Sequence, residues 1–436
     1  MERTPMDQPI LGCIADDLTG ATDLCNNLVR AGMRVVLMVD VPRSAGSLPA
    51  DAIVVALKSR TIVPTDAVAQ SLAACRWLRN CGVRQIYFKI CSTFDSTPQG
   101  NIGPVIESLM DELNCDFSVV VPSFPDNERT VFRGYLFVGD VLLSESGMRN
   151  HPLTPMNDAN LVRFLAQQLY SKKQRKLGLI DYRVVAQSTD AIRGRIDNLR
   201  SAGFSVAIAD SINNDDLLRL AGALCDDVFV TAGSGLAIGL PAQWGIHPSP
   251  ESARLPRGKG RRAVISGSCS VATNAQVEHF IQSGGNALSL DPIALSRNPD
   301  DVIEQAISWA DALWNSDPAQ VLLVYSTAKP ADLKVAHEQL GVEQSGELVE
   351  NALSQIARAF VQQGVGQLMV AGGETAGVCI RDIDVGGMQI GPQIDPGVPW
   401  CYALCPVAPQ GGIHLALKSG NFGTNDFFTK AFSMLE

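Results

Sequence analysis

Short apolar runs alternate with amphipathic stretches along most of this 436-residue chain, and this alternation constrains the fold more than any other feature. The run Ile10–Ala15 has the length of a buried strand, and the apolar residues between Ala21 and Leu28 then recur at the spacing of one helix face. The same pattern predicts strands at 35–39, 52–57, 85–90, 117–121, 176–180, 205–209 and 228–231, and helices at 65–80, 103–113, 160–169, 190–201 and 215–224. Strands alternating with helices over short connections are typical of α/β domains with a largely parallel sheet.

Two segments interrupt this rhythm. Residues Thr130–Leu143 alternate Val, Phe, Tyr and Leu between glycines, which predicts a hairpin inserted in the first sheet or flanking it. Residues 241–262 are rich in proline and glycine and lack periodicity, as a linker does. A length of about 150 residues per domain would allow two or three domains, and the linker favours two. We expect domains at 1–240 and 263–436, each α/β with a largely parallel sheet.

The composition argues against several classes of protein. The net charge is −10 and there is no basic tract, which disfavours a nucleic-acid-binding protein. No apolar run reaches the roughly 18 residues of a membrane span. The 11 cysteines include no C-x-x-C pair, so we expect reduced thiols that pack as small hydrophobes. With N-terminal residues too polar for a signal peptide, we expect a soluble cytoplasmic protein.

The first candidate site follows the first predicted strand. Ligands of open α/β sheets bind at the carboxyl ends of the strands, and Asp16 and Asp17 stand at such an end, before a helix. Either Asp17 or Thr19 could simply cap that helix, but capping does not account for both carboxylates. A carboxylate here could accept a hydroxyl proton or hold a substrate hydroxyl.

Two further polar segments lie in the first domain. The loop Lys89–Gly103 carries a lysine, four hydroxyl side chains and an aspartate, which suits a polyhydroxylated anion. An ordinary polar loop, with Thr97 or Asn101 capping a helix, explains its composition equally well. The cluster Ser144–Pro152 adds Arg149 and a histidine, and isolated histidines are more often structural.

Three loops of small residues follow strands of the second domain. They lie in Val264–Ser270, Leu368–Gly377 and Leu415–Thr424, and the first and last precede predicted helices at 271–281 and 426–432. Such loops cradle anions through backbone N–H groups and the helix dipole. None is a Walker A or G-x-G-x-x-G motif. Three together favour a nucleoside triphosphate, whereas the alternative is that the glycines only make tight turns.

These segments together resemble the four-carbon acid sugar kinase family over nearly the whole chain. The motifs that carry the resemblance are Ile14–Asp23, Asn101–Gly103, Ser266–Ser268, Gly372–Thr375 and Ser419–Gly423. Within the family, the stretches Cys91–Thr97, Gly134–Asp140 and Glu145–Pro152 look most like the branch that phosphorylates the 4-hydroxyl of 3-oxo-tetronates. The resemblance implies a sugar acid bound by the N-terminal domain and ATP bound by the C-terminal domain.

Roles for individual residues follow from the resemblance. It implies ATP contacts at Ser266, Gly372, Gly373, Glu374, Thr375 and Gly420. We expect Asp17 to take the C4 hydroxyl proton, with Asp95 as the alternative base, and Asp16 to orient substrate or metal. The substrate contacts are expected at Arg60, Lys89, Ser92, Thr93, Asp95 and Arg149. ATP and Mg²⁺ are the implied cofactors, with the metal ligands open, and the substrates would meet in a cleft between the domains that closes over them.

Other functions stay open at this stage. The substrate could be a related sugar acid, such as threonate or erythronate. A nicotinamide-dependent oxidoreductase is a common use of doubly wound sheets, but the glycine fingerprint is missing and Asp16 and Asp17 would repel a pyrophosphate. A sensor that binds both ligands without turnover is a third possibility. The stereochemistry of the substrate and the formation of a homo-oligomer are not determined by the sequence.

Overall fold

The computed structural model describes residues 8–42, 50–151, 153–169, 174–326 and 341–435. The polar N-terminal residues Met1–Asp7 and Pro152, both used in the sequence argument, lie outside this part. The chain divides into two compact units, Met1–Ala253 (unit 1) and Arg254–Glu436 (unit 2). The division falls inside the predicted linker 241–262, which contains most of the short helix α8 (Leu240–Gln243) and the 3₁₀ turn Pro250–Ala253.

Unit 1 is built on a parallel sheet, as predicted. Its strand order is β2-β3-β1-β4-β11-β5-β10-β9. The bounds are β1 Leu11–Ala15, β2 Val35–Val39, β3 Ala52–Ala56, β4 Gln85–Lys89, β5 Ser118–Val121, β9 Lys176–Ile180, β10 Phe204–Ala209 and β11 Phe229–Ala232. Ala15 pairs with Ala56 of β3 and Lys89 of β4, so the carboxyl ends of these three strands are level. The loops after them therefore emerge side by side.

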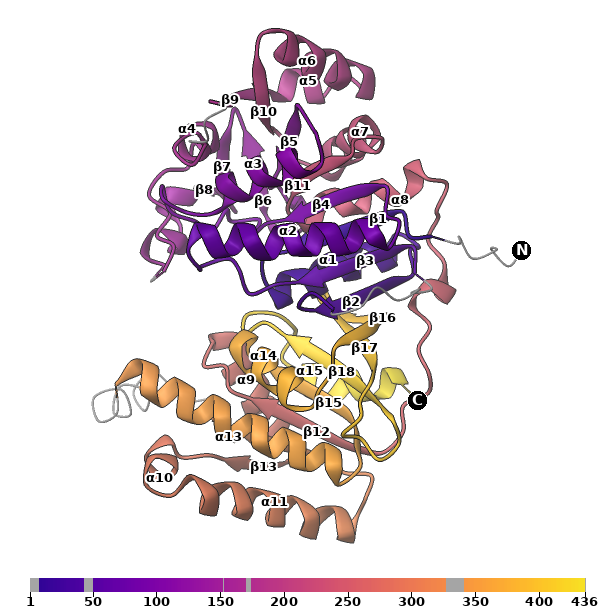
Figure 1. Ribbon diagram of the computed structural model, residues 1–436. Coiled ribbons are helices and arrows are strands. Elements are labelled where there is room, and N and C mark those ends of the chain that lie inside the picture. Colours follow the sequence, from indigo (N-terminus) through magenta and orange to yellow (C-terminus); the bar gives the residue numbers. More distant parts are fainter. Residues whose placement is uncertain (1–7, 43–49, 152, 170–173, 327–340, 436) are drawn as a thin grey trace. The chain divides into compact units, whose positions relative to one another are not determined.

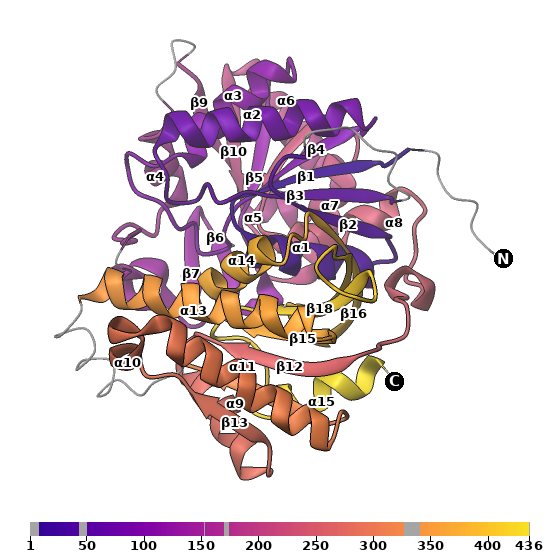
Figure 2. The ribbon, with the colours of Figure 1, turned by 60° about the horizontal axis from the view of Figure 1, so that its bottom comes forward.

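Helices cover both faces of this sheet, because each crossover returns the chain to a parallel strand. The helices are α1 Leu18–Arg30, α2 Pro64–Asn80, α3 Ile102–Glu112, α4 Leu161–Ala166, α5 Tyr182–Val185, α6 Thr189–Ser201, α7 Asn214–Leu224 and α8. Helices α2 and α3 pack together on one face, and α1 and α7 pack around the 3₁₀ turn η4 (Ser234–Ile238) on the other (Figure 2). The strands between them are buried on both sides, which explains their continuous apolar runs.

The segment expected to form a hairpin is a separate antiparallel sheet of three strands. These are β6 Arg129–Phe132, β7 Tyr135–Val138 and β8 Val141–Leu142. Asp210, which follows β10, anchors the β6–β7 turn by accepting from the N–H groups of Arg133 and Gly134, both at 2.8 Å. This attachment ties the insertion to the edge of the large sheet at which the functional loops emerge.

Unit 2 has a sheet of five parallel strands followed by two antiparallel ones (Figure 1). The order is β13-β14-β12-β15-β18-β17-β16. The bounds are β12 Arg261–Ser266, β13 Asn286–Ser289, β14 Val321–Tyr325, β15 Val365–Ala371, β16 Gly387–Asp395, β17 Val398–Leu404 and β18 Gly412–Lys418. Ala371 pairs with both Ser266 and Lys418, so β12, β15 and β18 also end level with one another.

The helices of unit 2 lie on both faces of its sheet. They are α9 Val271–Gln282, α10 Pro292–Arg297, α11 Pro299–Ser316, α13 Val342–Gln362, α14 Gly373–Asp382 and α15 Phe427–Lys430. The prediction of one helix at 426–432 is wrong. The α-helix α15 ends at Lys430, and a 3₁₀ turn continues to Leu435. Phe427, Phe428 and Phe432 are nevertheless all buried, because the tighter turn keeps them on the core side.

Two composition-based expectations can be compared with the structure. All 11 cysteines are free, as predicted from their spacing. No helix in the part of the chain that the structure describes is long and apolar enough to cross a bilayer.

Candidate functional site

Two carboxylates and a guanidinium meet at the level ends of β1 and β3. Arg60 donates to both oxygens of Asp16, from Nε at 2.9 Å and Nη2 at 2.8 Å. The same Nη2 lies 2.5 Å from Oδ1 of Asp17, and Nη1 lies 3.7 Å from Asp95. We call Asp16, Asp17, Asp95, Arg60 and Lys89 the carboxylate cluster. Of its three carboxylates, Asp17 is the most exposed, with 26% of its side-chain surface accessible.

The sequence builds this arrangement from local bonds. Asp17 is the N-cap of α1 and accepts from the Gly20 N–H at 3.0 Å, so the capping alternative holds for this residue. Thr19 adds a hydroxyl bond of 2.7 Å to its other oxygen. Capping does not involve Asp16, whose carboxylate is occupied by Arg60. Asp17 therefore combines a structural role with a position in the cluster.

The loop that carries Arg60 is fixed from both sides. The backbone N–H groups of Ser59 and Arg60 donate to the Asp16 carbonyl. Asn101, expected as a helix cap, makes no capping bond with its side chain. Its amide instead donates to the carbonyls of Ser59 at 2.7 Å, Arg60 at 3.3 Å and Ile62 at 3.1 Å. Asn101 thus holds the Arg60 loop in place.

Lys89, the fifth member of the cluster, ends β4 and is buried. Its ammonium donates to the Ile90 carbonyl at 2.9 Å. A Cβ on Gly20 would lie 2.8 Å from the Lys89 Nζ and would also collide with the Asp17 carboxylate. The first turn of α1 therefore needs glycine at position 20 for the lysine and the aspartate to approach so closely.

The charges in the cluster shift the pKa values of its members. Burial alone would raise the pKa of Asp17, but Arg60, Lys89 and the bonds from Thr19 and Gly20 outweigh it, so the pKa is lowered. Burial opposes the charge of Arg60, yet Asp16 and Asp17 raise its pKa well above the usual value. The site thus holds the Asp17 carboxylate ionised beside the Arg60 guanidinium in a largely water-excluded place.

The loop after β4 contributes unequally to the cluster. Thr93 donates to Asp95 at 2.6 Å and also contacts the Cys91 thiol. Because Asp95 faces Arg60, the expected residues Thr93 and Asp95 both lie on the Arg60 side of this loop. Ser92, half-buried between Cys91 and Thr93, is not a hydrogen-bonding partner of the cluster. Arg149 is exposed on the short turn Gly147–Asn150 and is not among the charged partners of Asp16, Asp17 or Asp95. The structure therefore does not bring Arg149 to the cluster.

Sequence reasoning gave no role to three polar residues beside the cluster, although one of them, Asp23, ends the first candidate motif Ile14–Asp23. Asp23 on α1 is buried, which raises its pKa, although a bond from Ser234 and the charges of Lys89 and Arg129 oppose the shift. Asp23 stands four residues after Thr19, on the same face of α1, and this spacing was an available signal. Arg129 reaches the site from β6, and Ser234 from the start of η4, after β11. Nothing local in the sequence indicates that they should.

The three small-residue loops of unit 2 also converge, at the ends of β12, β15 and β18. We call them the glycine loops: 266–270, 372–375 and 418–423. The Gly267 N–H donates to the Ala371 carbonyl at 3.0 Å, and the Gly372 N–H donates to the Lys418 carbonyl at 2.9 Å. Gly372 caps α14 with φ +123°, a conformation that other residues rarely adopt. Ser266 and Thr375 are buried beneath these loops, and Glu374 is exposed in the first turn of α14.

A buried lysine lies under the third glycine loop. Lys418 is 1% exposed, and burial lowers its pKa to about 7. Ser270, the N-cap of α9, and Thr273 bond the Gly420 carbonyl at 2.5 and 2.8 Å. Gly420, an expected contact, is thus held against the first glycine loop. Lys418 was not singled out from the sequence, although a lysine ending a buried strand of seven residues was a signal for it.

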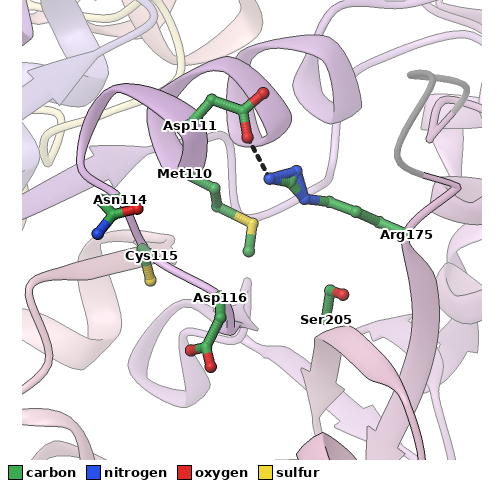
Figure 3. A pocket seen from close by; sticks show the side chains of 7 residues that line it. All are labelled: Met110, Asp111, Asn114, Cys115, Asp116, Arg175 and Ser205. Carbon is green, nitrogen blue, oxygen red and sulfur yellow. Dashed lines mark hydrogen bonds and ion pairs between the residues drawn. The ribbon is translucent and has the colours of Figure 1, made fainter.

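A cavity of about 340 Å³ lies elsewhere in unit 1 (Figure 3). Met110 and Asp111 belong to the last turn of α3, and Ser205 is the second residue of β10. The other lining residues lie in the segments that lead into β5 and β9: Asn114, Cys115, Asp116 and Arg175. All these strands are parallel to β1, so the cavity is at the amino ends of the strands and the carboxylate cluster is at the carboxyl ends. Functional groups of open α/β sheets lie at the carboxyl ends.

Comparisons with known proteins assign each unit to a type of domain. Residues 11–240 match the family model of a sugar-binding N-terminal domain, and residues 263–428 match that of a nucleotide-binding C-terminal domain. A curated protein of Pseudomonas fluorescens named 3-oxo-tetronate kinase is 49% identical, over 98% of this chain and 97% of that protein.

Solved structures give the same picture. A crystal structure from Haemophilus influenzae matches with a TM-score of 0.84 and 44% identity, covering 98% of this chain and 100% of the other. A second, from Salmonella typhimurium and described as a candidate tRNA synthase, matches with a TM-score of 0.87 and 39% identity, covering 98% and 99%.

Proposed function

Because the chain belongs to the four-carbon acid sugar kinase family, we propose that it transfers the γ-phosphoryl group of ATP to the C4 hydroxyl of a 3-oxo-tetronate. The product is the 4-phosphate, and the reaction is that of a phosphotransferase with an alcohol acceptor. The name shared by relatives at 41–49% identity supports the 3-oxo acid over threonate or erythronate. The net charge of −10 disfavours a tRNA substrate.

The observation that carries this proposal is the composition of the carboxylate cluster. A four-carbon sugar acid presents a carboxylate, hydroxyls and a keto oxygen. Arg60 and Lys89 supply positive charge for the carboxylate, and Thr93 and the aspartates supply partners for the hydroxyls. We propose that Ser92 and Asp95 also contact the sugar acid. We propose that Arg149, exposed on the turn Gly147–Asn150, contacts the sugar acid when this turn moves toward the cluster.

We propose Asp17 as the group that accepts the C4 hydroxyl proton. Phosphoryl transfer has a loose transition state, so the main task of the base is to orient the attacking oxygen and take its proton late. The lowered pKa of Asp17 keeps it ionised at neutral pH, and it is the most accessible carboxylate of the cluster. Both oxygens of Asp16 accept from Arg60, so we assign Asp16 to holding that guanidinium in place.

We propose that the glycine loops bind the ATP phosphates. The backbone N–H groups around Gly372, Gly373 and Gly420 and the N-termini of α9 and α14 favour anions. Ser266 and Thr375 support these loops from below, and Glu374 is exposed beside them. This assignment agrees with the nucleotide-binding model that matches unit 2.

The residues present suit a Mg²⁺ ion that the nucleotide brings with it. In kinases this ion keeps several waters and takes only one or two protein carboxylates beside the phosphates. Among the described residues there is no group of three or more His, Cys, Asp or Glu that would form a complete protein site. Glu374 is the accessible carboxylate at the glycine loops and would hold the ion there. When bound, Mg²⁺ neutralises charge that develops on the phosphate oxygens.

A coupled ADP-release assay tests the activity. We expect turnover of a 3-oxo-tetronate with MgATP, weaker turnover of threonate and erythronate, and none without a sugar acid. Release of ADP with threonate or erythronate alone would move the assignment to a related kinase. Binding of both ligands without ADP release would indicate a sensor, and reduction of a nicotinamide cofactor would indicate an oxidoreductase.

Paired substitutions test the base. We expect Asp17→Asn to lower kcat by at least about 100-fold, the usual contribution of a general base. We expect Asp95→Asn mainly to raise the KM of the sugar acid. Circular dichroism and the Tm of each variant establish that it is folded. If Asp17→Asn is folded and loses less than tenfold in kcat, Asp17 is not the base, and a larger kcat loss in Asp95→Asn would transfer the role to that residue.

A further inference from the structure

The carbonyl of Gly420 accepts three hydrogen bonds in unit 2. The donors are the Ser270 hydroxyl at 2.5 Å, the Thr273 hydroxyl at 2.8 Å and the Lys418 ammonium at 3.0 Å. A carbonyl oxygen has two lone pairs, so three donors saturate it. This peptide group therefore has one strongly preferred orientation, with its oxygen directed into unit 2.

Lys418 uses its whole bonding capacity within this loop and the helix α9 beside it. Its Nζ also donates to the Thr273 hydroxyl at 2.9 Å and to the Ser419 carbonyl at 3.1 Å, which accounts for its three N–H groups. Burial lowers its pKa, and within the described ranges no carboxylate forms an ion pair with its Nζ. The other titratable residues of β18 and of α14, the helix that contacts it, are His414, Glu374, Arg381 and Asp382. Among the described residues, none of their carboxylates forms an ion pair with the Lys418 Nζ. A buried, unpaired cation is costly and calls for an explanation.

The orientation of the Gly420 carbonyl determines that of the next N–H. The chain has no cis peptide bond among the described residues, and in a planar trans peptide the N–H points opposite to the C=O. The Asn421 N–H is therefore directed away from Lys418. Asn421 is exposed, and its N–H has no hydrogen-bond partner within the described ranges. The fixed Gly420 peptide thus exposes one N–H donor, that of Asn421, at the surface of the third glycine loop.

We propose that Lys418 is a positioning residue of the nucleotide site, which turns the Gly420 peptide so that the Asn421 N–H donates to a phosphate oxygen of ATP. The inference rests on the proposed function and adds to it a residue that does not touch the nucleotide. Ser270 and Thr273 share the task, because they bond the same carbonyl. The unpaired charge of Lys418 also acts through space on the phosphates.

The charge of Lys418 makes ATP affinity depend on pH. Burial lowers the pKa of Lys418 to about 7, so the ammonium and the neutral amine are both populated near neutral pH. A bound polyanion favours the ammonium and raises this pKa. By linkage, MgATP binds more weakly as pH rises through the pKa of the free protein, by up to tenfold per pH unit. The titration of ATP itself acts in the opposite direction, because its phosphate gains charge as pH rises.

Asn421→Pro removes the proposed donor, and its ring also restricts the backbone at residues 420 and 421. Asn421→Ala is the matched control, because it loses the side chain and keeps the N–H. We expect the Kd of the full-length protein for MgATP, measured by titration calorimetry, to rise about tenfold in the proline variant and less than twofold in the alanine variant. Equal affinity of both variants and wild type would overturn the proposal, as would equal loss in both.

A second pair of measurements tests the lysine. We expect Lys418→Met to weaken MgATP binding and to abolish its decrease between pH 6.5 and 8.5, which a purely structural role would not do. If this variant does not fold, Thr273→Val and Thr273→Ser test the orientation of the Gly420 carbonyl, because only the serine keeps the hydroxyl on it. We expect weaker MgATP binding in the valine variant than in the serine variant, and equal binding in both would overturn the proposal. An unchanged pH profile in Lys418→Met overturns the proposal. If the wild type binds no MgATP, the proposed function itself fails.

Discussion

At the scale of single residues, unit 1 contains two arginine–carboxylate ion pairs that have the same geometry and differ in exposure. Arg60 binds Asp16 and Arg76 binds Glu112, each with Nε–O 2.9 Å and Nη2–O 2.8 Å. The Arg60 side chain is 21% exposed and that of Arg76 is 61% exposed. Exposed pairs contribute about 0–1 kcal/mol, whereas disrupting a buried pair costs about 3–5 kcal/mol. The two ion pairs have the same geometry, but we expect the loss of the Arg60–Asp16 pair to destabilise the protein more than the loss of the Arg76–Glu112 pair.

We expect Arg60→Lys to raise the KM of the sugar acid at least tenfold and to lower the Tm, because a lysine cannot bridge Asp16 and Asp17 as the guanidinium does. We expect Arg76→Lys to change neither by more than the error of the assay. Steady-state kinetics and thermal denaturation of both variants measure this contrast. Similar effects in the two variants would mean that Arg60 is not part of a substrate site.

A second residue-scale prediction concerns Asp227, which is half-buried at the amino edge of β11. Burial raises its pKa from 3.8 to about 6. An acid with a raised folded-state pKa favours the folded state when protonated, so its contribution falls as pH rises from about 4 to 6 and is constant above. We expect Asp227→Asn to raise the Tm by about 2–4 °C at pH 7.5, for roughly 1 kcal/mol, and not at pH 4. A Tm gain of equal size at both pH values would exclude ionisation of Asp227 as its cause.

At the scale of elements, helix α14 offers a test of the glycine loops. Its cap, Gly372, has φ +123°, and a Cβ there would lie 2.9 Å from the Thr375 hydroxyl. Gly377 lies within the helix, where a Cβ would meet only the Arg381 guanidinium at 3.7 Å. We expect Gly372→Ala to raise the KM of ATP at least tenfold, because the loop must change its backbone.

Gly377→Ala is the matched control in the same helix. It should leave the kinetics unchanged and stabilise unit 2 by about 0.5–1 kcal/mol, as alanine favours helices over glycine. Initial rates at varied ATP and thermal denaturation give both quantities. A Gly372→Ala variant with wild-type KM would show that the second glycine loop does not contact the nucleotide.

The elements also show what a sequence can predict. Strands such as Leu11–Ala15 and helices such as Pro64–Asn80 were predicted nearly to the residue, because their apolar periods match burial on the sheet. The loops at strand ends followed from the same reasoning. Which loops become neighbours did not, because the order β2-β3-β1-β4-β11 is set by tertiary packing. Ser234 and Arg129 lie near the cluster only because of that strand order, so the sequence did not predict them. The unusual position of Lys418 becomes apparent only from its burial.

At the scale of the whole molecule, the proposed function divides the two substrates between the units. The carboxylate cluster belongs to unit 1 and the glycine loops to unit 2. Arg60→Lys should therefore change the KM of the sugar acid without changing the Kd of MgATP, and Gly372→Ala should do the reverse. Isothermal titration of MgATP and steady-state kinetics of each variant separate the two effects.

The double variant Arg60→Lys, Gly372→Ala extends this test to energetic coupling. Substitutions at sites that share no partner usually add within about 0.3–0.5 kcal/mol. Binding of MgATP alone should therefore be weakened by the double variant as much as by Gly372→Ala. The loss in kcat/KM for the sugar acid at saturating ATP should match that of Arg60→Lys. The loss in kcat/KM of the double variant could differ from that of Arg60→Lys by more than this range while the effects on MgATP binding add. The two substrates would then interact only during phosphoryl transfer. Non-additive binding of MgATP would mean instead that the carboxylate cluster influences the glycine loops before the sugar acid is present.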